Sequence, residues 1–145
     1  MTAPRWLVLT WRLPSNLSTG RVATWRSLQR LGAVSLTPGA AIVPYSEHLL
    51  EQLEWVAEDI AQRGGDAYVL PVTELPEADE EAIRRRMREE SREEYERIRS
   101  AAGHVRDGRE VAALRRGLAR AMERDHFASA GRTAAERAVR RAEKE

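Results

Sequence analysis

The sequence contains no cysteine, only one lysine, and no long hydrophobic run. The absence of cysteine excludes a disulfide framework, a thiol nucleophile and a metal site with thiolate ligands, and it suits a reducing cytoplasm. No apolar stretch approaches the roughly 18 residues that a membrane-spanning helix needs, so we expect no membrane partner. Arg12 interrupts the apolar residues near the N-terminus, which argues against a signal peptide.

Catalytic and metal-binding motifs are also missing from the sequence. The three histidines, His48, His104 and His126, share no metal-ligand spacing, so we expect neither a metal nor a cofactor. No nucleophile elbow, phosphate-binding loop or dinucleotide-binding glycine motif occurs. The paired glutamates after residue 79 alternate with arginines at helical spacing, which is typical of a solvated helix face. These observations favour a protein that is not an enzyme.

Charge is distributed unevenly along a chain whose formal net charge is only +1. Residues 1–46 contain five arginines and no acidic residue, whereas residues 47–76 contain seven acidic residues and one arginine. From residue 77 onward, 18 basic residues stand against 16 acidic ones. An acid-free basic segment of this kind is a candidate for contact with phosphates.

Apolar periodicity predicts a compact α+β domain in residues 1–76. The pattern indicates five segments: a strand at 6–13, a helix at 19–31, a hairpin at 33–44, a helix capped by Ser46, and a strand at 67–72. This order is that of a ferredoxin-like β-α-β-β-α-β domain, in which two helices cover one face of a four-stranded antiparallel sheet. We expect the other face to be open.

Residues 77–145 are predicted to form an α-helical extension. We expect one charge-dense helix at 79–102, a second at about 110–126, and a third opened by a capping box at Thr133–Glu136. The apolar stripes of these helices are too narrow for independent stability, so the helices should pack on something else. The candidates are the open sheet face and a second copy of the chain.

Three arginines of the first helix are candidates for contact with DNA or an oxyanion. The predicted apolar stripe of this helix is Val22, Trp25, Leu28 and Leu31. On a helical projection, Arg21 falls within the apolar arc that contains Trp25 and Leu28. A guanidinium on a buried side must find acceptors, which are either groups of the protein itself or a bound anion. Arg26 and Arg30 project toward solvent one turn apart, either as solvated side chains or as phosphate contacts.

Other candidates lie on the first strand and in the extension. Trp6 and Arg12 share the expected open sheet face and could form a stacking platform for single-stranded nucleic acid, unless helices or a second copy cover that face. A cation at the end of this strand disfavours a metal-dependent nuclease. Residues 102–145 hold 11 basic and seven acidic residues, which adds three candidate phosphate contacts: Arg115, Arg116 and Arg120.

Several segments resemble the N-terminal region of the ChrB family of chromate-resistance regulators: WLVLTWRLP, RVATWRSLQRLGAVSLTPGAAIVP, EEYERI and LRRGLARAMERDHFAS. The first 75 residues also resemble the ferredoxin-like middle domain of PaaX-type repressors. We interpret the following as motif or structural residues of this resemblance: Trp6, Trp25, Tyr95, Arg124, Asp125 and Phe127.

The resemblance implies a cytoplasmic, non-enzymatic protein in the transcriptional control of chromate resistance. It implies binding to promoter DNA, as a homodimer or together with another protein. Longer family members carry a C-terminal domain that would begin where this chain ends. The chain is therefore expected to be either a trimmed part of such a protein or a stand-alone form, and a separate sensor domain or protein is an expected partner. Two alternatives remain: a structural or oligomerisation module without direct DNA contact, and an oxyanion sensor that binds chromate.

Overall fold

The computed structural model describes residues 2–14 and 18–145 and divides into two compact units. Unit 1 is Met1–Glu81 and unit 2 is Ala82–Glu145. The long helix α3 (Glu77–Ala102) begins in unit 1 and continues into unit 2. The division therefore falls inside a helix, whereas the sequence suggested one between residues 76 and 77, where the composition changes.

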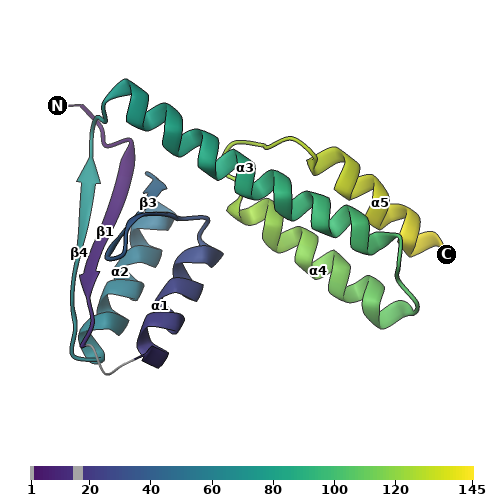
Figure 1. Cartoon of the computed structure of the whole chain (residues 1–145), viewed down its shortest axis with the longest axis horizontal. Coiled ribbons are helices and arrows are strands. Elements are labelled where there is room, and N and C mark those ends of the chain that lie inside the picture. The colour runs from purple at the N-terminus through teal and green to yellow at the C-terminus, as the bar shows by residue number, and fades with distance from the viewer. Residues whose placement is uncertain (1, 15–17) are drawn as a thin grey trace. The chain divides into compact units, whose positions relative to one another are not determined.

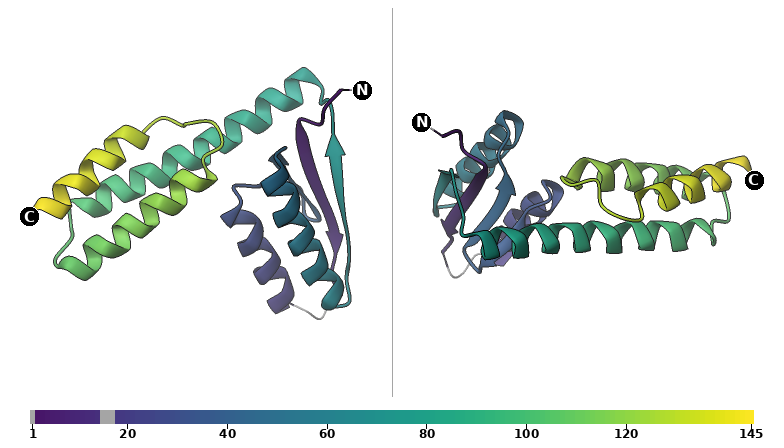
Figure 2. Two further views of the ribbon diagram at one scale, coloured as in Figure 1. Left: turned by 180° about the vertical axis from the view of Figure 1, so that it is seen from behind. Right: turned by 90° about the horizontal axis from the view of Figure 1, so that it is seen from above.

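Unit 1 consists of a four-stranded antiparallel sheet with two helices on one face (Figures 1 and 2). Its elements are β1 (Trp6–Arg12), α1 (Ser18–Arg30), β2 (Val34–Thr37), β3 (Ala40–Pro44), α2 (Glu47–Gln62) and β4 (Asp66–Val72). The strand order is β2-β3-β1-β4, and each neighbouring pair is antiparallel. The predicted α+β class and its β-α-β-β-α-β arrangement are confirmed.

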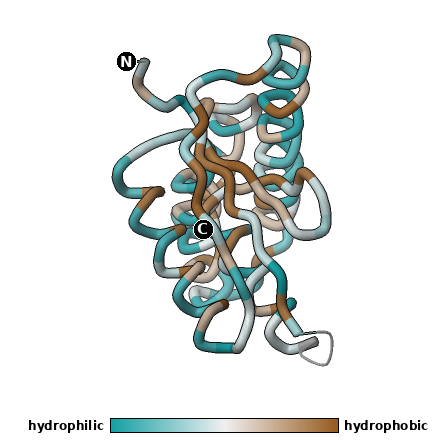
Figure 3. The backbone as a smooth tube through the Cα atoms, turned by 90° about the vertical axis from the view of Figure 1, so that its left-hand side faces the viewer, coloured by the Kyte–Doolittle hydropathy of each residue, from teal (hydrophilic) through white to brown (hydrophobic). Residues whose placement is uncertain are grey.

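The core of unit 1 lies between the sheet and these two helices. Alternate side chains of β1, Leu7 and Leu9, point into the core, where they meet Leu28 of α1 and Leu53 of α2. The strands at the centre of Figure 3 are largely brown, the colour of hydrophobic residues. Ser46 caps α2 as predicted, since its side-chain oxygen accepts a hydrogen bond from the Leu49 N–H at 3.0 Å.

The buried stripe of α1 differs from the predicted one. The structure buries Thr24 and Leu28, whereas Val22 and Trp25 are 49% and 37% exposed. Arg21 is exposed as well, so its predicted place on the buried side of the helix is wrong. The helical projection followed the large apolar residues, but α1 instead turns the smaller Thr24 toward the rest of unit 1.

Unit 2 contains the remainder of α3 together with α4 (Gly108–Arg124) and α5 (Arg132–Lys144). Helices α3 and α4 match the predicted helices to within two residues at every end. The predicted capping box at Thr133 is wrong, because α5 begins one residue earlier and has no side-chain cap. Gly131 occupies the N-cap position with a φ of 93°, a left-handed conformation that glycine adopts without strain.

The helices of unit 2 bury their narrow stripes against one another. One cluster joins Tyr95 of α3 to Leu118 and Ala121 of α4 and to Ala135 and Val139 of α5. A second cluster is built on alanines of α3 and α5, which allow a close helix approach. The extension therefore has a core of its own, which the sequence analysis did not consider. Within the described residues, no helix is long and apolar enough to cross a membrane.

Candidate nucleic-acid interface

The two units carry opposite formal charge. Unit 1 has six basic and 11 acidic side chains, a net charge of −5, whereas unit 2 has 18 basic and 12 acidic side chains, a net charge of +6. The difference in charge is smaller when the chain is divided between residues 76 and 77, because the acidic residues at the start of α3 are then counted with the helical part rather than with unit 1. Since attraction to a polyanion depends on local charge, unit 2 is the better suited to contact nucleic acid.

Two of the predicted phosphate contacts pair with carboxylates of the same molecule. Arg12 at the end of β1 contacts Asp66 of β4 at 3.0 Å, directly across the antiparallel pair. Arg115 of α4 contacts Glu143 of α5 at 2.8 Å. Both ion pairs are exposed, so each contributes at most about 1 kcal/mol to stability. A phosphate would have to compete with a carboxylate for either arginine.

Three further candidates, Arg21, Arg26 and Arg30, lie exposed on α1. Arg30 donates a hydrogen bond to the Ser27 hydroxyl at 3.1 Å. The neighbouring helix α2 carries five acidic residues and neither lysine nor arginine. An acidic helix beside a basic one repels phosphates, so the surroundings of α1 disfavour a DNA surface there.

The predicted stacking residue Trp6 is buried, with only 1% of its surface exposed. Trp6 is therefore not available to stack on a base. Two aromatic or apolar residues that the sequence analysis missed, Tyr68 and Leu70, are 66% and 47% exposed. They pair with Thr10 and Val8 of β1, and this register places them on the same sheet face as Trp6.

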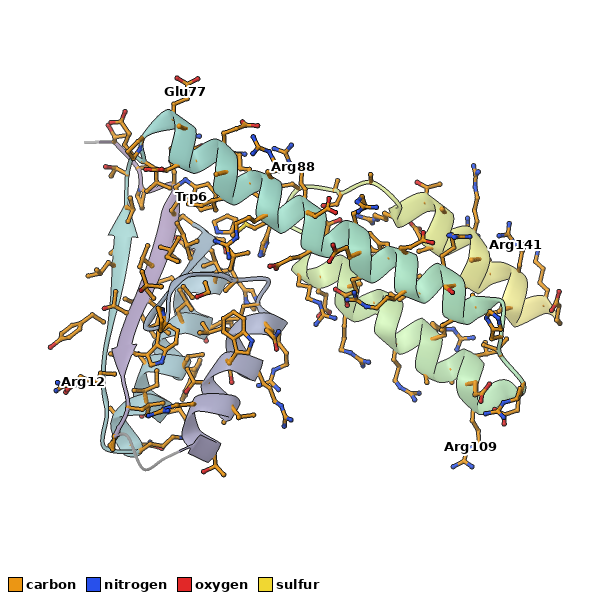
Figure 4. All side chains as sticks on the ribbon, in the orientation of Figure 1. Trp6, Arg12, Glu77, Arg88, Arg109 and Arg141 are labelled. Atoms are coloured by element: carbon orange, nitrogen blue, oxygen red, sulfur yellow. The ribbon has the colours of Figure 1, made fainter. Side chains whose placement is uncertain are left out.

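One face of α4 carries three exposed arginines. Arg109, Arg116 and Arg120, here called the α4 stripe, are separated by seven and four residues and therefore lie on one side of the helix. They span about 16 Å along the helix axis. All three are exposed, and within the described part of the chain none forms an ion pair. Figure 4 shows Arg109 pointing away from the helices of unit 2.

Arg116 and Arg120 of this stripe were predicted phosphate contacts, whereas Arg109 was not, because the second helix of the extension was predicted to begin at about residue 110 and α4 begins at Gly108. The basic face of α5 was missed as well. That face carries four exposed cations, and in the described residues none of them has a carboxylate partner: Arg137, Arg140, Arg141 and Lys144. Figure 4 shows Arg109 and Arg141 pointing to opposite sides of unit 2.

A groove of about 600 Å³ lies beside the α4 stripe, between α3 and α4. Arg97 of α3 and Arg120 of α4 line it, together with the apolar Leu114. Ala113 and Gly117 also line the groove and place little side-chain bulk on this side of α4. A ligand can therefore approach the α4 backbone closely while it contacts arginines from both helices.

The motif residues Tyr95, Arg124 and Asp125 form a polar cluster at one end of the same two helices. The Tyr95 hydroxyl donates a hydrogen bond to Asp125 Oδ2 at 2.8 Å, and Arg124 Nε donates to Glu94 Oε2 at 2.8 Å. Asp125 also accepts hydrogen bonds from the backbone N–H and the hydroxyl of Ser129, each at 2.7 Å. The cluster ties α3 to the end of α4 and to the turn before α5.

These contacts set the ionisation of the cluster. Burial alone would raise the pKa of Asp125, but hydrogen bonds from Ser129, Tyr95 and Phe127 outweigh burial and lower that pKa. Burial, followed by the hydrogen bond to Asp125, raises the pKa of Tyr95. At neutral pH the carboxylate is therefore an acceptor and the phenol a donor, as their hydrogen bond requires.

Phe127 lies in the same turn, and its ring contacts two arginines of α3. The guanidinium carbons of Arg84 and Arg88 lie 5.1 and 5.9 Å from the centre of its ring, within the range of cation–π attraction. We therefore assign the motif residues of unit 2 to its folding. No group of three or more potential metal ligands occurs among the described residues.

The fold and these surfaces define a two-unit protein in which a ferredoxin-like α+β unit precedes an arginine-rich helical unit. The chain belongs to the family described as Protein ChrB, N-terminal, whose model matches residues 21–110. It is 33% identical over 113 residues to Protein ChrB of Cupriavidus metallidurans. That alignment covers 76% of this chain and 35% of the relative, so the chain spans about a third of the relative's length.

No solved structure matches the chain significantly. The ChrB resemblance drawn from the sequence motifs is confirmed, while the likeness of the first 75 residues to PaaX-type repressors stays a prediction. The family match extends from α1 to the first turn of α4. Arg116 and Arg120 lie beyond that match, so the family match covers only Arg109 of the α4 stripe.

Proposed function

We propose that this chain takes part in the transcriptional control of chromate resistance as a non-enzymatic, cytoplasmic protein that binds promoter DNA through unit 2. Its membership of the ChrB family supports the regulatory role. The observation that carries the DNA contact is the α4 stripe, in which three exposed arginines have no carboxylate partner within residues 2–14 and 18–145. Each phosphate that such an arginine neutralises releases condensed counterions, which favours binding.

The geometry of unit 2 supports a phosphate contact along α4. Gly117 and Ala113 leave room for close approach beside the stripe, and Arg97 adds a cation from the far side of the groove. The net charge of +6 on unit 2 attracts DNA over a longer range. Contacts to phosphates position a protein on DNA but read no sequence, so base recognition requires further side chains.

The proposal leaves signal detection to another part of the system. The chain spans about a third of its curated relative, and we propose that a separate sensor domain or protein detects the signal. A chromate sensor within this chain is a second candidate, since Arg97 and Arg120 line one groove from two helices. Glu94 and Glu110 also line this groove, and their carboxylates oppose a small oxyanion held inside it.

DNA binding is tested by fluorescence anisotropy with a promoter fragment, measured as a function of salt. The variant Arg109→Gln/Arg116→Gln/Arg120→Gln should weaken binding and lower the slope of log K against log salt by about 2.7, for three lost phosphate contacts. The matched control is Arg137→Gln/Arg140→Gln/Arg141→Gln, which removes the same charge from α5. We expect this control to change the slope much less.

Three outcomes count against the proposal. Failure of the unmodified chain to bind promoter DNA at low salt would refute direct contact. Equal losses in the two triple variants would show attraction by net charge without a surface on α4. A chain stabilised by chromate but indifferent to DNA would favour the sensor, because ligand at 100 times its dissociation constant adds roughly 2.7 kcal/mol to stability.

A further inference from the structure

Helices α1 and α2 lie side by side on the same face of the sheet and carry opposite charge (Figures 1 and 2). Helix α1 contains three arginines and no acidic residue. Helix α2 contains five acidic residues and neither lysine nor arginine. Unit 1 thus presents a helical layer that is basic on one side and acidic on the other.

Each of these two helices also exposes a tryptophan. Trp25 of α1 is 37% exposed and is accompanied by Val22, while Trp55 of α2 is 60% exposed. Tryptophan is enriched among the residues that dominate binding energy at protein interfaces, so each of these two side chains is a candidate anchor. The helical layer therefore offers apolar anchors within a charged surround.

Several charged side chains of the layer have no partner of opposite charge among the described residues. In the described ranges, neither Arg26 nor Arg30 pairs with a carboxylate, and Arg30 donates a hydrogen bond to the Ser27 hydroxyl. On α2, four carboxylates follow one another at helical spacing along one face, and no described cation pairs with them: Glu47, Glu51, Glu54 and Glu58. Asp59 differs, since it pairs with Arg63 at 2.9 Å.

We propose that this helical layer is the interface of a homodimer, in which α1 of one copy packs on α2 of the other. A two-fold axis brings one surface against itself, so its two halves must complement each other. With the axis along the helices, each basic α1 meets an acidic α2. With the axis across them, α1 meets α1 and like charges oppose one another, so charge selects the first arrangement.

A second copy of the chain fits this surface better than nucleic acid does. Helix α2 lies beside α1, so DNA that contacts α1 also approaches the carboxylates of α2, which repel phosphates. A second copy carries the required basic and acidic halves at the same spacing as the surface that it meets. The same association places two α4 stripes in one particle, as expected for a protein that binds paired half-sites.

The dimer does not rest on the proposed DNA contact, because the interface lies in unit 1 and the α4 stripe lies in unit 2. Analytical ultracentrifugation of the full chain over a range of protein concentrations should show a reversible dimer. The dimer should weaken between about 0.1 and 1 M salt, where the screening length falls from about 10 to 3 Å. Trp55→Ala should weaken association about tenfold or more.

Charge reversal gives the decisive test. Arg26→Glu/Arg30→Glu changes the net charge of α1 from +3 to −1, so both helices become acidic. Glu51→Arg/Glu54→Arg/Glu58→Arg changes the net charge of α2 from −5 to +1, so both helices become basic. Each variant alone should therefore be mainly monomeric. Mixed together, the two variants should form a heterodimer, which neither variant could do if it had merely misfolded. The matched control Arg137→Glu/Arg140→Glu makes the same charge change as the first variant in unit 2 and should leave the dimer intact.

A chain that stays monomeric at every concentration would overturn the inference. It would also fail if both reversed variants dimerised normally, if their mixture stayed monomeric, or if the unit 2 control dissociated equally. Anisotropy with promoter DNA on the same variants separates the two proposals, since monomeric variants with an intact α4 stripe keep their phosphate contacts. Loss of the dimer then reports on the helical layer, and loss of the salt slope reports on α4.

Discussion

Replacement of Tyr95 by phenylalanine removes one hydroxyl and the 2.8 Å hydrogen bond that it donates to Asp125. A hydrogen bond to a charged group contributes about 1.5–3 kcal/mol. The ring should stay in place, because it is fully buried in the cluster with Leu118 and Val139. Asp125 also keeps both hydrogen bonds from Ser129, so we expect the lower end of the range, about 1.5 kcal/mol.

This loss should be visible in thermal unfolding. Unit 2 is the size of a small domain, for which 1 kcal/mol shifts the Tm by about 4–8 °C, so Tyr95→Phe should lower its Tm by about 6–12 °C. Far-UV circular dichroism follows the helices of both units, and most of the helical residues belong to unit 2. Tryptophan fluorescence follows unit 1, because all four tryptophans precede residue 82. The shift should therefore be larger in the first signal than in the second.

A double-mutant cycle with Asp125→Ala tests the reasoning behind this number. Asp125→Ala should cost more than Tyr95→Phe, because it leaves the buried Tyr95 hydroxyl and Ser129 without their acceptor. The coupling between the two sites should be about 1.5 kcal/mol, whereas independent sites add to within about 0.5 kcal/mol. If the two single changes destabilise unit 2 but their coupling falls within that margin, the hydrogen bond is not what stabilises the cluster.

Two further predictions concern a helix cap and acid stability. Ser46→Ala should lower the free energy of unfolding of unit 1 by about 1 kcal/mol, and Ser46→Asp should not, because aspartate also accepts from the Leu49 N–H; urea unfolding followed by tryptophan fluorescence compares them. The pKa of Asp125 is lower in the folded state than its unfolded value of about 3.9, so its contribution is complete above that pH and disappears as the pH falls through the folded pKa. In thermal unfolding followed by circular dichroism, Asp125→Asn should reduce the fall in Tm as the pH is lowered. The same fall in Tm for the variant and the unmodified chain would contradict the role of Asp125.

Local patterns in the sequence were sufficient to predict the sheet of unit 1. The alternation of Leu7 and Leu9 marks a strand with one buried face, and Ser46 marks a helix start, because each signal depends on a few neighbouring residues. Helix α1 shows where this reasoning ends. Its orientation depends on which side chain fits against the rest of unit 1, so Thr24 is buried and Trp25 is exposed.

The polar cluster of unit 2 depends on contacts that periodicity does not encode. Tyr95 and Asp125 lie 30 residues apart, and only the family motifs drew attention to them. The α4 stripe was found in part, since Arg116 and Arg120 stood out by charge. Arg109 could not be placed on the stripe without knowing that α4 begins at Gly108. The ion pair of Arg115 with Glu143 could not be predicted without knowing how α5 packs on α4.

The formal charge is separated between an acidic unit 1 and a basic unit 2, although the net charge of the whole chain is only +1. In dilute buffer, the cationic helices of unit 2 in one molecule attract the acidic surface of unit 1 in another, and such head-to-tail contacts between dimers lead to clouding. Added salt screens these contacts first, because they are long-ranged and exposed. The protein should therefore dissolve better as salt is raised from very low levels, and it should bind both cation- and anion-exchange resins.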